Sequence, residues 1–235
     1  MKNRVVFSIV SPIYNDMNTL SRVLPVLLSR VKSLQKQFEI VLLDDGSRDG
    51  SREWIAEYAK KFPTIVVRYH DTNQGVAKTY RELYALARGE YVVLFSLDGE
   101  WDPEDAVRLL TKCIKNGYDI VVGVRTKKQY SLWRMIVSFL YNQLNRMLFG
   151  VNTHDAGSIK VFRKHVLTLP IISRGVFDEA ERLIRASRAG FRIGSLAISH
   201  AKTVKRHRGI RFMHVIEAMT DVWRVYGDVM LKLKK

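Results

Sequence analysis

The sequence predicts an α/β fold built on a doubly wound, mostly parallel sheet. Short apolar runs rich in β-branched residues alternate with longer amphipathic segments through residues 1–125, as expected for successive strand–helix units. Capping residues separate these segments, for example Asp102 followed by Pro103. Acidic side chains directly follow several of the apolar runs, at the position where ligands bind in open parallel sheets.

The expected elements follow these periodicities along the chain. Strands are expected over residues 4–11, 38–43, 65–69, 91–95 and 119–124. Helices are expected from residue 17 to about 36 and over 51–62, 75–88 and 103–116. Pro25 predicts a kink in the first helix or a late start, because its ring clashes with the preceding turn. Beyond these, we expect helices over 131–149, 178–189 and 210–232 and strands over 158–163 and 191–198.

Composition and charge narrow the class of protein. The chain has 235 residues, of which 47% are hydrophobic, and this suits a single domain over residues 1–235. A net charge of +16 favours binding to polyanions such as nucleic acid, phosphorylated ligands or anionic lipid headgroups. The single cysteine, Cys113, excludes an internal disulfide framework and fits a reducing compartment. Neither a secretory signal nor a membrane-spanning segment is predicted.

Acidic groups end three of the predicted strands and suggest a nucleotide site. They are Asp16, the pair Asp44 and Asp45, and the pair Asp98 and Glu100. An extended backbone would point the Asp98 and Glu100 carboxylates the same way, toward a shared Mg²⁺ or Mn²⁺ ion. The alternative is an acidic turn in which Asp102 caps the next helix. No GxGxxG follows the first strand and no P-loop occurs in the sequence.

Several motifs resemble those of glycosyltransferase family 2, whose members have the GT-A fold. SPIYND, LLDDGSRDGS, SLDGEWDP and IVVGVR occur in the family's order and spacing. The resemblance implies that the nucleotide sugar is bound by Pro12, Tyr14, Asp16, Asp44, Asp45, Lys78, Asp98 and Arg206. Ser96 replaces the usual first acid of the DxD motif and Glu100 replaces a common Gln, so we expect the metal to be held by Asp98 and Glu100. The alternative is a metal-free or inactive relative.

The second half resembles dolichol- and polyprenol-phosphate mannose synthases, through Arg134 and Ser138 in LWRMIVSFLYNQL and through DAGSIKVFRK and FDEAERLIRASRAGFRI. The resemblance implies that the acceptor phosphate is bound by Arg125, Arg134, Ser138, Arg206 and Arg208. It also implies catalytic roles for Asp98, Arg125 and Asp155. Glu179 and Glu181 could position the sugar or the acceptor, although an ion pair with Arg185 explains Glu181 equally well. The basic segment 200–211 could instead be a solvated turn.

The resemblance implies inverting, metal-dependent transfer of a hexose, with mannose from GDP-mannose as the first choice, to a polyprenyl or dolichyl phosphate. Residues 1–125 would bind the nucleotide sugar and 126–235 the acceptor. We expect peripheral binding to the cytoplasmic side of a membrane with anionic lipids through the interfacial helices 131–149 and 210–232; a separate membrane-spanning protein is a candidate partner. The alternatives are UDP-glucose as donor, a family 2 transferase acting on a glycan hydroxyl, and a nucleic-acid-binding protein. No nucleic acid is expected, because no RNP, helix-turn-helix or zinc pattern occurs.

Overall fold

A single mixed sheet organises the molecule. The computed structural model describes residues 5–126, 132–151, 155–175, 177–199 and 212–231. Within them, seven strands form one sheet in the order β3-β2-β1-β4-β6-β5-β7. The strands are β1 (Phe7–Ile13), β2 (Phe38–Asp44), β3 (Ile65–Tyr69), β4 (Tyr91–Leu94), β5 (Ile120–Arg125), β6 (Lys160–Arg163) and β7 (Ile193–Ile198). The α/β class predicted from the sequence is confirmed, because every pairing except those of β6 is parallel.

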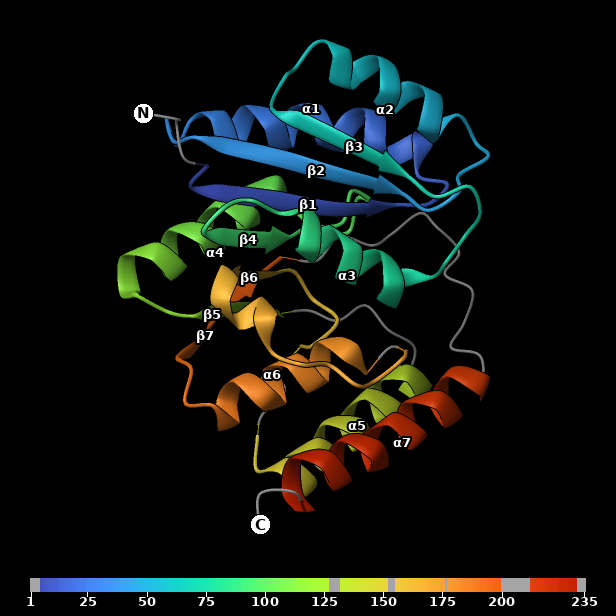
Figure 1. Cartoon of the computed structure of the whole chain (residues 1–235), viewed down its shortest axis with the longest axis vertical. Coiled ribbons are helices and arrows are strands. Elements are labelled where there is room, and N and C mark those ends of the chain that lie inside the picture. The colour runs from blue at the N-terminus through green and yellow to red at the C-terminus, as the bar shows by residue number, and fades with distance from the viewer. Residues whose placement is uncertain (1–4, 127–131, 152–154, 176, 200–211, 232–235) are drawn as a thin grey trace.

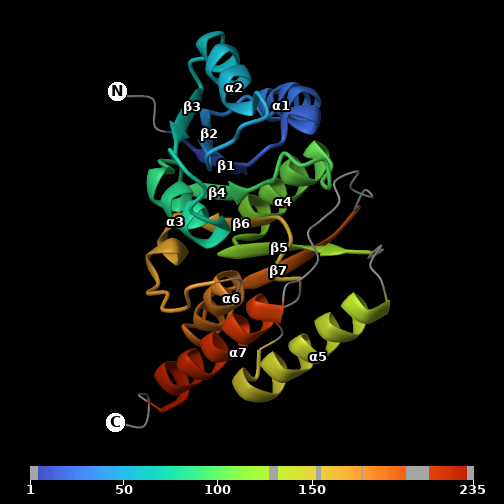
Figure 2. The same cartoon turned by 90° about the vertical axis from the view of Figure 1, so that its right-hand side faces the viewer.

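Helices cover both faces of this sheet, and two more lie beyond its β5 and β7 end. They are α1 (Met17–Lys32), α2 (Ser51–Lys60), α3 (Val76–Leu86), α4 (Pro103–Asn116), α5 (Leu132–Phe149), α6 (Asp178–Arg188) and α7 (Phe212–Tyr226), with a 3-10 helix η1 (Lys164–Thr168) and a π-helix η2 (Gly227–Leu231). Helices α1, α2 and α4 contribute to one hydrophobic core, and α3, η1 and α6 contribute to the other (Figures 1 and 2). The sheet is therefore buried on both faces, as its apolar strands require.

Helices α5 and α7 lie side by side at the end of the molecule beyond β5 and β7 (Figures 1 and 2). A third, smaller core joins them to α6 through Phe149, Phe177, Ile184, Val222 and Val225. The two amphipathic C-terminal helices expected from the sequence are thus present. Among the described helices, none has the length and apolar character needed to cross a bilayer.

The first helix differs from its prediction. It runs from Met17 to Lys32 with Pro25 inside it, so a late start at Pro25 is wrong. Leu24, Leu27 and Leu28 around the proline are buried, and this packing outweighs the one backbone hydrogen bond that a proline removes. The caps of α4 are confirmed: Asp102 accepts a hydrogen bond from the Glu104 backbone amide at 2.9 Å, and the C-cap residue Gly117 has φ 64°.

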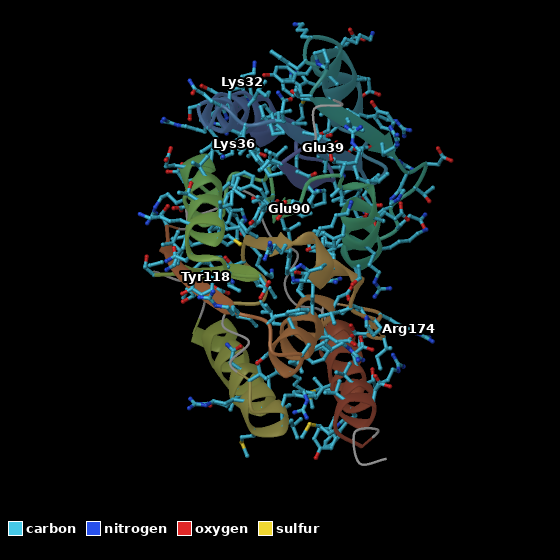
Figure 3. The ribbon with its side chains drawn as sticks, turned by 60° about the vertical axis from the view of Figure 1, so that its left-hand side comes forward. Lys32, Lys36, Glu39, Glu90, Tyr118 and Arg174 are labelled. Carbon is cyan, nitrogen blue, oxygen red and sulfur yellow. The ribbon has the colours of Figure 1, made fainter. Side chains whose placement is uncertain are left out.

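Strand β6 runs antiparallel to its neighbours, so its amino end lies where the parallel strands have their carboxyl ends. We call this side of the sheet its carboxyl edge, and the opposite side its amino edge. The first residue of β6, Lys160, pairs with Leu94 at the end of β4 and with Val122 in β5. The amino end of β6 therefore lies beside the carboxyl end of β4. The arrowheads of β1, β2 and β4 point toward the carboxyl edge (Figure 1). Figure 3 looks at the opposite edge, where Glu39 and Glu90 lie near the amino ends of β2 and β4.

Candidate active site

The loops after β1 and β2 are joined by hydrogen bonds into one platform. The backbone amides of Asn15 and Asp16 each donate to a serine hydroxyl at 3.0 Å, Ser47 and Ser51 respectively. The backbone amide of Met17 donates to Asp49 Oδ2 at 3.0 Å. Sequence reasoning did not single out Asp49, although its place in the DDGSRDG motif was a signal. These bonds hold Asp16 and the segment that follows Asp44 in a defined relative position.

Asp44 lies where the sequence places it, at the carboxyl end of β2, and it is fully buried. Its Oδ2 accepts a hydrogen bond from the Ser47 backbone amide at 3.2 Å. Its Oδ1 has no hydrogen-bond partner in the described part of the chain. A buried carboxylate oxygen without a partner is costly, so this atom is suited to accept a hydrogen bond from a ligand. A ribose hydroxyl or a base N–H would supply such a donor.

The carboxylate of Asp45 is engaged within the protein. Its Oδ1 accepts from the Gln74 amide and contacts His70 Nδ1, both at 2.7 Å, and its Oδ2 accepts from the Gly75 amide at 3.0 Å. Asp45 thus anchors the segment that leads into α3. Lys78 also has a local partner, since its ammonium group donates to Gln74 Oε1 at 3.0 Å. A nucleotide role for Asp45 and Lys78 stays a prediction.

The acidic turn after β4 does not have the extended backbone expected from the sequence. Gly99 has φ 83°, and Asp98 Oδ1 accepts a hydrogen bond from the Glu100 amide at 3.0 Å. The chain turns here because a short aspartate side chain bonds the backbone two residues on and glycine tolerates positive φ. The alternation argument for Asp98 and Glu100 is therefore wrong. The two carboxylates nevertheless interact electrostatically.

Charge is concentrated at this turn. Burial raises the pKa of Asp98, and the negative charges of Glu100 and Asp16 raise it further, while hydrogen bonds from the Glu100 amide and the Ser96 hydroxyl oppose the shift. Ser96 stands where the usual DxD motif has its first acid. It thus forms a hydrogen bond with Asp98, the acid of that motif which this sequence keeps. Like charges held together out of water are unfavourable unless a cation or a proton neutralises them.

The residues at this turn fit a divalent metal ion. Among the described residues, no group of three or more His, Cys, Asp or Glu side chains is placed to hold a metal ion. Mg²⁺, however, is commonly bound by one or two carboxylates, with the remaining positions filled by water and substrate phosphates. Asp98 and Glu100 could supply those carboxylates, and the raised pKa of Asp98 marks a charge cluster that a cation would relieve.

A cavity of about 190 Å³ opens between α3, α6 and the amino end of β6. This inner pocket is lined by Val76, Ala77, Tyr80, Leu94, Ala156, Gly157, Ser158, Lys160, Gly175, Asp178 and Glu179. Burial raises the pKa of the Tyr80 phenol, as do the negative charges of Glu179, Asp98 and Glu100. Tyr80 therefore links the inner pocket to the acidic turn.

Lys160 is a basic residue of the inner pocket that sequence reasoning did not single out. It is fully buried, and its ammonium group donates to the carbonyls of Ala156 and Ser158 at 2.7 Å. It also pairs with Glu179 Oε2 at 3.1 Å. Burial lowers the pKa of Lys160 and the charge of Glu179 opposes this. A lysine inside an apolar predicted strand was the available signal, since a buried lysine needs partners.

Arg125 and Asp155, both predicted to be catalytic, form one buried ion pair. Arg125 Nε donates to Asp155 Oδ2 at 2.6 Å, and a second guanidinium nitrogen bonds Oδ1. The guanidinium also lies 5.4 Å from the centre of the Trp101 ring. The structure thus brings these two residues together at the end of β5. Their roles toward a substrate stay predictions.

The remaining predicted residues divide into four groups. Glu181 is structural, because it pairs with Arg185 at 2.6 Å and accepts from the Ile172 and Ser173 amides. Arg134 and Ser138 lie on α5 one helical turn apart, but their side chains lie outside the described residues. Arg206 and Arg208 also lie outside them. Pro12 and Tyr14 lie at the end of β1 and in the loop that follows it.

The family model for glycosyl transferase family 2 matches residues 8–168, more than half of the chain. The chain belongs to glycosyl transferase family 2. It is similar to undecaprenyl-phosphate 4-deoxy-4-formamido-L-arabinose transferases from Aeromonas hydrophila and Shewanella sediminis, each 30% identical over 92% of this chain. The matched regions span 66% and 65% of those two relatives, so about a third of each has no counterpart in this chain.

Solved structures share the GT-A fold with this family 2 chain. A mannosyltransferase from Pyrobaculum calidifontis in complex with GDP-Man and Mn²⁺ superposes with a TM-score of 0.67 at 17% identity, covering 95% of this chain and 65% of its own. Glucosyl-3-phosphoglycerate synthase from Mycobacterium tuberculosis in complex with Mn²⁺, UDP and phosphoglyceric acid gives 0.71 at 17% identity, covering 95% and 79%. The predicted GT-A fold is confirmed.

Proposed function

We propose that this family 2 chain is a glycosyltransferase that moves a sugar from a nucleoside diphosphate to a polyprenyl phosphate. Two observations carry the proposal: the acidic cluster of Asp16, Asp98 and Glu100, and the unpartnered oxygen of buried Asp44, which ends a neighbouring part of the same sheet. The names of the undecaprenyl-phosphate relatives support the lipid acceptor. We infer that Asp44 accepts a hydrogen bond from the ribose or the base.

Asp98 and Glu100 would hold Mn²⁺ or Mg²⁺. When bound, such an ion neutralises charge that develops on the leaving diphosphate. Tyr80, Lys160 and Glu179 supply donors and acceptors of hydrogen bonds in the inner pocket, and they would orient the hydroxyls of the sugar. A lipid phosphate is already ionised at neutral pH, so the attacking oxygen does not have to lose a proton to a strong base.

Three sugars are candidates for the group that is transferred. The motif resemblance favours GDP-mannose, with UDP-glucose as the alternative. The names of the relatives favour 4-deoxy-4-formamido-L-arabinose. All of these donors would use the same acidic turn, because we propose that it contacts the diphosphate rather than the sugar. The lining of the inner pocket would discriminate between a hexose and a formamido pentose.

Membrane association is proposed for the end of the molecule formed by α5 and α7. On α5, Leu140 is 60% exposed and Met147 is 83% exposed, and on α7 Trp223 is 58% exposed. Exposed aliphatic and indole side chains on amphipathic helices favour binding at a lipid surface, and the net charge of +16 adds attraction to anionic headgroups. We propose peripheral binding on the cytoplasmic side.

The test is single-turnover transfer from a panel of nucleotide sugars to a short polyprenyl phosphate, with Mn²⁺ or with EDTA. The acceptor assignment is tested by Arg134→Ala, with Arg146→Ala on the same helix as a matched control. Loss of a charge-assisted contact should lower transfer by Arg134→Ala about ten- to a hundredfold. Arg146→Ala should retain wild-type transfer. Normal transfer by Arg134→Ala contradicts the acceptor assignment, and absence of transfer from every donor contradicts the proposed function.

A further inference from the structure

A second cavity lies on the α3 side of the sheet, between α3, η1 and α6. Its volume is about 360 Å³. Among the described residues, three cations line it, Arg81, Lys164 and Arg182, and no acidic side chain does. Its remaining wall includes Leu167, Leu169 and Ile171. This cationic cavity is separate from the inner pocket, because no residue in the part of the chain that the structure describes lines both.

Arg182 is the decisive residue of the cationic cavity. It is buried, and its Nε has no hydrogen-bond partner in the described part of the chain. A carboxylate oxygen, Glu179 Oε1, is 3.8 Å from Nε, and the Tyr84 ring centre is 5.0 Å from the guanidinium carbon. A buried guanidinium donor without a partner is unfavourable. A negative charge in the cavity that Arg182 lines would offset this buried positive charge.

The other two cations extend the same positive surface to solvent. Lys164 is exposed, and no ion pair involving its side chain occurs in the described residues. Arg81 keeps 41% of its side chain exposed while its Nε pairs with Asp178 at 2.9 Å. One buried and two accessible cations around a cavity with an apolar wall form a site for an anion that carries a small organic group.

We propose that the cationic cavity binds a small organic phosphate monoester. Its phosphate would contact Arg182, Lys164 and Arg81, and its organic part would pack against Leu167, Leu169 and Ile171. Because Arg81 and Arg182 also face Asp178 and Glu179 of the inner pocket, the bound anion competes with those carboxylates for the two guanidinium groups. Binding of an anion in the cationic cavity would therefore weaken the interactions of Asp178 and Glu179 in the inner pocket with these two guanidinium groups.

The test is calorimetric titration of the full chain with phenyl phosphate and with inorganic phosphate, in EDTA and at low salt. Lys164→Gln should weaken phenyl phosphate binding about tenfold by removing a charge-assisted contact. Ala85→Glu places an acid in the cavity wall from an exposed position of α3 and should abolish binding. Lys36→Gln, which removes the same charge from an exposed residue elsewhere (Figure 3), should leave the affinity within about twofold.

Inorganic phosphate should bind about tenfold more weakly than phenyl phosphate, because it buries no apolar surface. Equal phenyl phosphate affinity in the wild type, Lys164→Gln and Ala85→Glu would overturn the site. Absence of binding of either probe at millimolar concentration would also overturn it. If inorganic phosphate binds as tightly as phenyl phosphate, the monoester class is wrong. None of these readouts depends on sugar transfer, so they are independent of the proposed function.

Discussion

Two carboxylates at opposite edges of the same sheet experience opposite environments. At the amino edge, Glu39 is buried and accepts hydrogen bonds from the Ser8 hydroxyl and from the Arg88 amide and Nε, each at 2.7 Å. Burial raises the pKa of Glu39, but these bonds and the charge of Arg88 lower it below its usual value overall. At the carboxyl edge, burial and neighbouring acids leave the pKa of Asp98 raised.

The difference separates structural acids from acids suited to a ligand. Glu39 is buried and Asp98 is partly buried, but of these two carboxylates only Glu39 has a cation among the groups that set its pKa. A charge that the fold itself neutralises stabilises the fold. Acids that are held together without enough cations or hydrogen-bond donors around them destabilise the fold, and such arrangements are concentrated at functional sites. Substitutions at the two edges should therefore affect different properties.

The largest expected effect is on activity, for Asp98→Asn. Loss of a charged ligand for the metal should remove about 3–4 kcal/mol of transition-state stabilisation, which lowers transfer by about a hundred- to a thousandfold. The free energy of unfolding at pH 7 should not fall, because the substitution removes a carboxylate whose charged form is disfavoured in the folded state. Single-turnover transfer and urea unfolding measure the two quantities. Wild-type transfer by Asp98→Asn would exclude Asp98 from the mechanism.

Glu39→Gln should have the opposite result. Hydrogen bonds to a charged group contribute about 1.5–3 kcal/mol, so the free energy of unfolding at pH 7 should fall by about that amount while transfer per folded molecule is retained. The folded-state pKa of Glu39 is lowered. Its contribution is therefore present above its unfolded value near 4.5 and is lost as pH falls through the folded pKa. Urea unfolding of both proteins as a function of pH measures this. A difference that does not change at acid pH would contradict the assignment.

A smaller effect with the reverse pH dependence is expected for His70→Gln. Burial lowers the pKa of His70, but hydrogen bonds and charges of Asp45 and Glu82 raise it overall. The raised pKa means that this stabilisation, about 0.5–1.5 kcal/mol for a typical hydrogen bond, is fully present below the unfolded value of 6.5 and is lost as pH rises through the folded pKa. Unfolding free energies of wild type and variant should converge at alkaline pH. A gap that widens with rising pH would show that His70 binds Asp45 and Glu82 as a neutral ring.

Local patterns in the sequence determined much of the architecture. They also located most of the acids that we propose for nucleotide binding. Alternating strand and helix periodicity predicts parallel strands, and parallel strands bring their carboxyl ends to one edge. The acids Asp16, Asp44 and Asp98 could therefore be placed together without coordinates. The cap at Asp102 and the end of α4 at Gly117 depend only on adjacent residues, so they too were predictable.

Only the tertiary structure decided which residues complete the site. Strand β6 is a four-residue antiparallel insertion between β4 and β5. Periodicity does not specify such non-local pairing, because a short apolar run fits many positions in a sheet. That insertion places Lys160 against Glu179. The contact of Arg125 with Asp155 likewise depends on how segments distant in the sequence pack together. The turn at Gly99 and the hydrogen bond between Ser96 and Asp98 depend on how the loop after β4 folds. Sequence identifies these groups as polar, whereas packing determines which of them neutralise one another and which are left for a ligand.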